Sequence, residues 1–184
     1  MPRYAALFRA VNLPSYGKLS MSALRGLLEE LGLRDVQTIL QSGNALVSSP
    51  RSASALENLI ERELLARLMV ETDVIVRAGP ELAEVIAGNP FPREAANDPG
   101  HLVVVFLKST PAAGAVEVLR KAVKGPELVH GEGRHLYVSY PAGIGTSKLT
   151  AALIDRKLGV RGTARNWNTV RKLNAHTGGE AGGR

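Results

Sequence analysis

The stretch GNPFPREAANDPGHLVVVFLK, residues 88–108, decides the fold. Its first part holds three prolines and two glycines, a composition typical of a linker or a long loop. Its second part, residues 101–108, is a short apolar run that predicts a buried strand. This strand opens a series of elements that repeats the series found before the linker.

The elements before the linker follow the order strand, helix, strand, strand, helix, strand. A strand is predicted over residues 3–8, and a helix runs from a cap at Ser20 to a stop at Gly32. Residues 36–49 predict two strands around a turn at residues 42–44. Ser54, with Glu57 three residues later, fits the capping box of a second helix. The fourth strand is predicted at residues 72–77 and a short helix at residues 80–87.

The same order follows the linker. A helix is predicted over residues 111–123, and residues 127–140 predict a hairpin with its turn at residues 131–134. A second helix is expected from a cap at Ser147 to a stop at Gly159. The fourth strand then lies at residues 160–165, and a last helix begins near Asn166.

Two copies of the order β-α-β-β-α-β predict an α+β protein of two ferredoxin-like units in tandem duplication. The first unit is expected over residues 1–79 and the second, with a C-terminal helix, over residues 101–176. A short helix and a linker loop fill residues 80–100, and residues 177–184 are expected to be a disordered tail.

Length and composition indicate a globular protein. A chain of 184 residues with 45% hydrophobic residues can bury the core of one domain or of two small units. The absence of cysteine excludes disulfides, thiolate metal sites and a thiol nucleophile. No apolar run approaches the roughly 20 residues of a membrane helix, and Arg9 interrupts the first apolar run too early for a signal peptide. We expect a cytoplasmic protein with no membrane partner.

The charge is distributed unevenly along the chain. Residues 1–92 carry 9 Lys and Arg against 10 Asp and Glu, whereas residues 93–184 carry 14 against 7. A local basic excess attracts anionic partners, such as a phosphate, a nucleotide or a nucleic acid. The alternative interpretation is a solvated basic face that keeps the protein soluble.

Residues 143–148, GIGTSK, superficially resemble a phosphate-binding loop. The spacing of a P-loop is absent here, and it is absent from GKLS at residues 17–20 as well. Two interpretations remain for residues 143–148. Either the expected helix start binds an anion with help from Ser147 and Lys148, or Ser147 only caps the helix and Lys148 points to water.

The segment RNWNT, residues 165–169, contains the single tryptophan and also allows two interpretations. Trp167 can stack on a base while Arg165 pairs with a phosphate and Asn166 or Asn168 reads polar edges. Alternatively, Asn166 caps the last helix and Trp167 forms an apolar stripe with Val170 and Leu173. The helical spacing favours the second interpretation for Trp167. It does not explain Arg165.

Signals for catalysis are sparse. The chain has neither a G-x-S-x-G nor an H-E-x-x-H motif, and His130 and His135 lack the nearby pair of carboxylates that would complete a metal site. We predict no metal and no cofactor. The central strands lack the aromatic residues on which an RNA-recognition sheet stacks bases.

Two stretches resemble a bacterial family catalogued as domain of unknown function 1697. The first is LFRAVNL…GKLSMSALRGLLEELGLRDVQTILQSGNALVSS, residues 7–49. The second is YPAGIGTSKLTAALIDRKLGVRGTARNWNTVRKL, residues 140–173. QSGN and RNWNT are the most specific parts, and the chain has LPSYG where the family usually has a glycine-rich turn. The resemblance implies paired ferredoxin-like units, but it implies no activity.

The leading hypothesis is a module that binds an anionic ligand through the basic C-terminal unit around Lys148, Arg165 and Arg171. The alternative is an enzyme for a small phosphorylated or carboxylated substrate in a cleft between the units. A third hypothesis is a dimerising scaffold in which exposed sheet edges pair. The candidate ligand-binding residues are Arg9, Asn12, Lys18, Gln41, Ser42, Asn44, Ser147, Lys148, Arg165, Asn166, Asn168 and Arg171.

Overall fold

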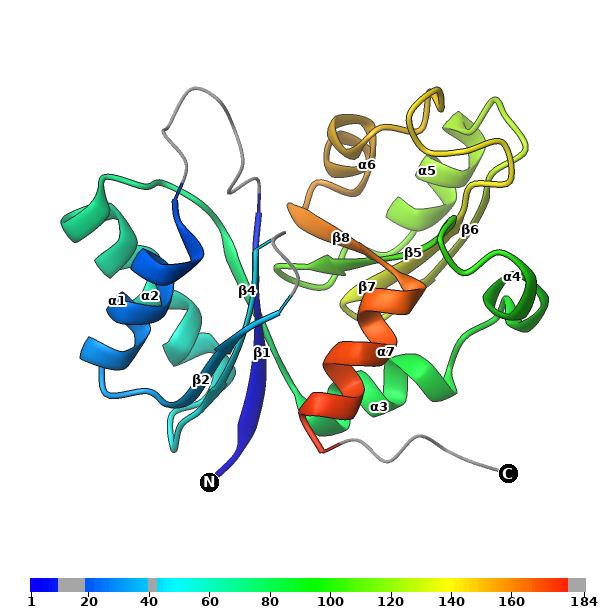
Figure 1. The fold of residues 1–184 in the computed structure, drawn as a ribbon. Helices are drawn as coiled ribbons and strands as arrows, with labels where there is room; N and C mark the ends of the chain where they lie inside the picture. Colours follow the sequence, from blue (N-terminus) through cyan, green and yellow to red (C-terminus); the bar gives the residue numbers. More distant parts are fainter. Residues whose placement is uncertain (10–18, 40–42, 179–184) are drawn as a thin grey trace. The chain divides into compact units, whose positions relative to one another are not determined.

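The fold is a mixed α+β arrangement with two four-stranded antiparallel sheets and seven helices among the residues that the structure describes (Figure 1). The structure is a computed structural model and describes residues 1–9, 19–39 and 43–178. The described residues of Met1–Glu84 and of Leu173–Arg184 form one compact unit, and Val85–Lys172 form a second. The domain limits expected from the sequence stay predictions.

The first sheet has the strand order β2-β3-β1-β4. Its elements are β1 (Arg3–Phe8), α1 (Met21–Glu30), β2 (Arg34–Thr38), β3 (Asn44–Ser48), α2 (Ala53–Leu68) and β4 (Val74–Ala78). Strand β1 is central and pairs with both β3 and β4 in antiparallel register. The predicted strand at residues 3–8 and the predicted cap at Ser20, whose hydroxyl accepts from the N–H of Ala23, are confirmed.

Helices α1 and α2 cover one face of the first sheet (Figure 1). Alternate residues of the strands, such as Tyr4, Ala6 and Phe8 on β1, point to this face because side chains alternate along a strand. They pack on the apolar stripes of the helices, which include Leu24 and Ile60. This burial is the main source of stability for the unit.

The cap predicted for the second helix is wrong by two residues. Ser52, and not Ser54, accepts a hydrogen bond from the N–H of Ala55, at 3.3 Å. Glu57 does not close a capping box, because its carboxylate accepts a hydrogen bond from the N–H of Val76 instead. The contact of Glu57 with β4 has replaced the capping-box hydrogen bond at the start of α2.

The second sheet has the order β6-β7-β5-β8, which is the order of the first sheet with the strands of the second series. Its elements are β5 (Leu102–Leu107), α5 (Ala115–Ala122), β6 (Leu128–Glu132), β7 (His135–Ser139), α6 (Ala151–Leu158) and β8 (Gly162–Asn166). Helices α5 and α6 cover one face of this sheet (Figure 1). Their core includes Leu119, Ile154 and Leu158, together with Val103 and Val105 of β5.

Three further helices complete the described chain: α3 (Gly79–Ala87), α4 (Pro92–Asn97) and α7 (Trp167–His176). Helix α4 lies within the expected linker, so residues 88–100 are not loop throughout. It begins at Pro92. Proline suits the first helical position, because an N–H at this position would have no acceptor within the helix. No helix among the described residues is long and apolar enough to cross a membrane.

Candidate functional site

Arg165 is a buried residue of β8. Only 9% of it is exposed, and its Nη1 donates to Thr163 Oγ1 at 2.7 Å and to the Ala164 carbonyl at 2.8 Å. Burial lowers the pKa of Arg165 to about 10, so the guanidinium still carries its charge at neutral pH. The strand itself therefore supplies hydrogen-bond partners for this side chain.

Arg165 and Lys148 are not brought together. Ala164 lines a cavity of about 300 Å³ beneath α6, with Val105 and Ile154. Because side chains alternate along a strand, Thr163 and Arg165 point to the other face of the sheet. Lys148 lines a second cavity, and none of the described residues of β8 or α7 contributes to it.

The other residues of RNWNT lie around the start of α7. Asn166 caps this helix, because its Oδ1 accepts from the N–H of Thr169 at 3.0 Å. Trp167 is 5% exposed, and Val170 and Leu173 are buried, which confirms the apolar stripe. Asn168 is exposed on α7, and so is Arg171.

The predicted residues of the first unit are only partly described. Asn12, Lys18, Gln41 and Ser42 lie outside the described residues, as does the LPSYG segment at residues 13–17. Asn44 is fully buried, and its Nδ2 donates to the Ile39 carbonyl at 3.2 Å within the hairpin. Arg9 is half-buried after β1, and its N–H donates to the Asp73 carbonyl at 3.0 Å.

Ser147 does not cap α6, which corrects the sequence prediction. The helix begins at Ala151, and Thr150 is its N-cap, accepting from the N–H of Leu153 at 3.2 Å. The stop predicted at Gly159 is confirmed, with φ of +68° at that residue. Ser147 and Lys148 therefore belong to the loop that precedes the helix.

This loop forms one wall of a cavity of about 560 Å³ in the second unit. The other walls are the end of α5 with the turn before β6, and one side of α6. The lining residues are Ala122, Val123, Lys124, Gly125, Pro126, Glu127, Ala142, Gly143, Thr146, Ser147, Lys148, Leu149, Leu153 and Lys157.

Three lysines line the cavity, and each comes from a different segment: Lys124 follows α5, Lys148 lies in the loop, and Lys157 is on α6. None of them forms an ion pair with another of the described residues. Among the described residues, Glu127 is the one carboxylate in the lining. The cavity thus has an excess of positive charge beside an apolar wall that includes Leu149 and Leu153.

Glu127 and Ser147 form the polar centre of the cavity. The hydroxyl of Ser147 donates to Glu127 Oε1 and accepts from the N–H of Leu149 at 3.0 Å. The hydroxyl of Tyr140 donates to the Leu149 carbonyl at 2.9 Å. Burial, with a smaller contribution from the charge of Glu127, raises the pKa of Tyr140 to about 12. These contacts fix the loop on both sides of Lys148.

Sequence reasoning missed Lys124, Glu127 and Lys157. Lys157 lies near the end of the helix predicted between Ser147 and Gly159, and Lys124 and Glu127 lie in a short turn without a motif. Their common feature is the cavity, and it exists only when α5 packs against α6. No pattern along the chain shows this packing.

Among the described residues, no group of three or more His, Cys, Asp or Glu side chains is arranged to hold a metal ion. His130 Nε2 lies 3.7 Å from Glu132, and His101 Nδ1 lies 2.9 Å from Asp98. Each is a single pair at the surface.

The fold is shared with a solved structure. A conserved bacterial protein from Streptococcus pneumoniae superposes with a TM-score of 0.73 and 20% identity, over 96% of this chain and 98% of that chain. At this identity the likeness concerns the fold alone. No curated protein matches the chain.

Residues 1–137 match the family described as Protein of unknown function (DUF1697), and the chain belongs to this family. The resemblance seen in residues 7–49 is therefore confirmed. The second resembling stretch, residues 140–173, lies beyond the matched part. The family description assigns no activity, so the function is argued from the cavity.

Proposed function

We propose that the second unit binds a small organic anion, with a phosphate or carboxylate group, in the cavity between α5, α6 and the loop at residues 142–149. The observation that supports this proposal is the convergence of Lys124, Lys148 and Lys157 from three segments on one cavity. Lysine binds phosphate as a compact point charge, and charge-assisted hydrogen bonds are about twice as strong as neutral ones. The proposed site keeps Lys148 of the expected site and does not include Arg165 or Arg171.

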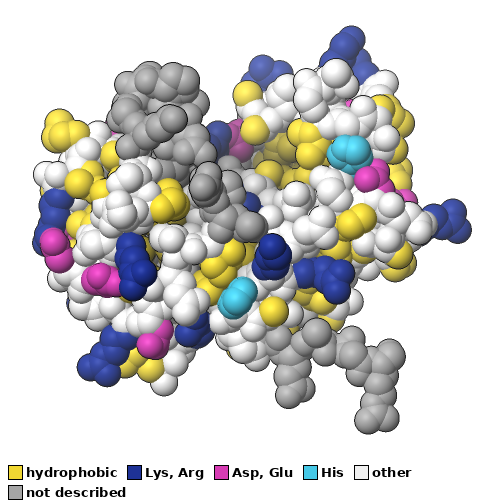
Figure 2. Space-filling model, in the orientation of Figure 1, with side chains coloured by type: hydrophobic (Ala, Val, Ile, Leu, Met, Phe, Trp, Pro, Cys, Tyr) yellow, Lys and Arg dark blue, Asp and Glu magenta, His cyan; other side chains and the backbone are white. Residues whose placement is uncertain are grey.

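The size and the walls of the cavity favour a small molecule. Its volume of about 560 Å³ falls within the range of small-molecule sites. Val123, Pro126 and Leu153 offer apolar surface beside the lysines, which suits a ligand with an apolar or aromatic portion, such as a nucleotide. On the face that Figure 2 shows, Lys and Arg side chains lie in separate groups and not in one continuous patch. This face therefore offers no continuous basic surface to the backbone of a nucleic acid.

The proposal is tested by a thermal-shift screen with nucleotides, sugar phosphates, polyphosphate and short oligonucleotides at low and raised salt. A ligand at about 100 times its Kd adds about 2.7 kcal/mol of stability, which raises the Tm of a domain of this size by roughly 5–10 °C. Screening by salt weakens an electrostatic ligand contact, so the shift is expected to decrease at raised salt.

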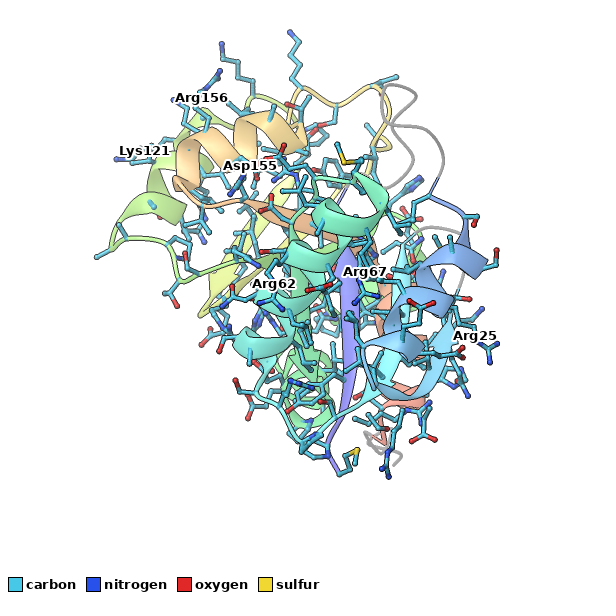
Figure 3. The ribbon with its side chains drawn as sticks, turned by 90° about the vertical axis from the view of Figure 1, so that its left-hand side faces the viewer. Arg25, Arg62, Arg67, Lys121, Asp155 and Arg156 are labelled. Carbon is cyan, nitrogen blue, oxygen red and sulfur yellow. The ribbon has the colours of Figure 1, made fainter. Side chains whose placement is uncertain are left out.

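Matched variants locate the site. Lys124→Ala and Lys157→Ala each remove one cavity lysine and are expected to weaken binding about tenfold. Lys121 and Arg156 are the controls, because they project from the outer faces of α5 and α6 (Figure 3) and do not line the cavity. Equal losses of affinity in Lys121→Ala and Lys124→Ala would contradict the proposal. An unchanged Tm with every compound would contradict it as well.

We also infer that both units are ferredoxin-like and arose by duplication, in a cytoplasmic protein. The support is the same strand order in both sheets, with the first strand in the centre and the fourth at an edge. In both units a carboxylate from the second helix accepts a hydrogen bond from the fourth strand: Glu57 from Val76, and Asp155 from Gly162.

A further inference from the structure

We propose that Ser147 is a nucleophile that accepts a phosphoryl group from a small acyl phosphate, with Glu127 as the general base. The inference rests on the proposed function, because the donor has to bind in the lysine-lined cavity. It goes beyond that function, since it assigns a covalent modification to one hydroxyl group.

The hydrogen bonds of Ser147 suit a nucleophile. A serine hydroxyl has one proton and two lone pairs. The proton is directed to Glu127 Oε1, and one lone pair accepts the N–H of Leu149. The second lone pair remains for an incoming phosphorus atom. Ser147 is half-buried and lines the cavity, so a bound donor can reach it.

The carboxylate of Glu127 lies between Ser147 and the backbone at Gly125. A Cβ atom at position 125 would lie 2.3 Å from Glu127 Oε2, so Gly125 leaves the space that the carboxylate occupies. A carboxylate hydrogen-bonded to a hydroxyl is the arrangement that general-base activation requires.

The lysines supply the second requirement of phosphoryl transfer. In this reaction the protein mainly positions the groups and neutralises the charge on the transferred phosphoryl oxygens. Lys124, Lys148 and Lys157 line the same cavity as Ser147. Three positive charges match a dianionic phosphoryl group better than the single oxyanion of an acyl transfer, which is why we assign phosphoryl chemistry.

The step conserves atoms and charge. The Oγ of Ser147 forms a bond to phosphorus while the bond between phosphorus and the bridging oxygen of the acyl phosphate breaks. The electron pair of that bond leaves with the carboxylate product. The proton of the hydroxyl passes to Glu127 Oε1, and water later removes it.

The experiment incubates the full chain with acetyl phosphate and follows the intact mass, with peptide mapping to locate the modification. We expect a mass gain of one phosphoryl group on Ser147. Ser147→Ala abolishes it, and Ser147→Thr, which keeps a hydroxyl, retains part of it. Glu127→Gln slows it by about 10²-fold or more, as expected for loss of a general base. Ser109→Ala is the control, because Ser109 is an exposed hydroxyl of the same unit that does not line the cavity.

The outcomes separate this inference from the proposed function. A wild-type chain that shows a thermal shift with inorganic phosphate or AMP but is never phosphorylated at Ser147 overturns the inference alone. Acetylation of the cavity lysines without phosphoserine overturns it as well, and so does a loss of labelling in Ser109→Ala as large as the loss in Ser147→Ala. If no anion shifts the Tm, the proposed function itself fails. Circular dichroism of Ser147→Thr and Glu127→Gln checks that the fold is retained.

Discussion

Glu57 on α2 accepts a hydrogen bond from the backbone N–H of Val76 on β4, with 2.8 Å between Oε1 and N. Strand β4 is at the edge of its sheet, so this N–H points away from the other strands. The N–H of Val74 donates to Glu61 and the N–H of Ala78 donates to Glu81, at 2.8 and 2.9 Å. Glutamates therefore cover alternate donors of an edge strand, which otherwise invites pairing with another chain.

Replacing Glu57 is expected to destabilise the first unit. Glu57→Ala leaves the N–H of Val76 buried without its acceptor and removes the carboxylate 4.0 Å from Nη1 of buried Arg77. A cost of about 3 kcal/mol follows. Glu57→Gln keeps an acceptor oxygen and costs less. Urea unfolding measures both, and the exposed Glu30→Ala, which loses a surface pair with Arg67, costs at most about 1 kcal/mol. Equal costs for all three variants would contradict the argument.

Removing the edge glutamates is expected to promote self-association. Glu61→Ala combined with Glu81→Ala leaves the outward N–H groups of Val74 and Ala78 open to a second strand. Sedimentation velocity over a range of concentrations is expected to show more dimer than in the wild type. Glu29→Ala, on the exposed surface of α1, is the control. An unchanged association state in the double variant would show that the edge is protected by other means.

The strands and most helix ends follow from local sequence. Apolar runs gave β1 and β5, and Ser20 and Gly159 marked helix ends, because a cap satisfies backbone groups within one turn of the residue itself. These elements depend on neighbours in the chain. Their repeated order was enough to expect two similar units.

The errors came from residues whose local signal competes with a distant partner. Ser54 with Glu57 has the spacing of a capping box, but Glu57 bonds to β4. Ser147 lies before a helical pattern, but it bonds to Glu127, twenty residues earlier, and Thr150 caps the helix. A sequence pattern contains no information on which of two acceptors or caps a packed structure selects.

The residues of the candidate cavity could not be grouped from the sequence either. The sequence groups Lys148 with Arg165, which points to the opposite face of the sheet from the α6 side. The lysines that line the same cavity as Lys148 are Lys124 and Lys157, and they come from segments that meet only through the packing of α5 on α6. The charge distribution along the chain therefore indicates a basic second half, but it does not show which basic side chains share a surface.

The two asparagines of RNWNT are expected to differ in their effect on stability. Asn166→Ala removes the side chain that accepts from the N–H of Thr169, and loss of such a cap costs about 1 kcal/mol. Asn168→Ala changes an exposed position in the helix and costs close to nothing, since Ala has the higher helix propensity. Thermal and urea unfolding of both variants measure the difference. A larger loss of stability in Asn168→Ala than in Asn166→Ala would contradict the assignment of Asn166 as the helix cap.

Tyr140 is expected to make the second unit sensitive to alkaline pH. Its pKa is about 12 in the folded chain and about 10 in the unfolded chain, so between these values the unfolded chain has lost a proton that the folded chain retains. Stability therefore falls as the pH rises from about 10 to 12. Tyr140→Phe lacks this proton and is expected to lose less stability over the same window. At neutral pH it loses about 1 kcal/mol with the hydrogen bond to the Leu149 carbonyl.

Glu127→Gln is expected to lower the pKa of Tyr140, because the charge of Glu127 helps to raise it. Urea unfolding across this window, with an absorbance titration of the tyrosines, tests both expectations. Parallel stability curves for the wild type and Tyr140→Phe would show that Tyr140 ionises in the folded chain as it does in the unfolded one.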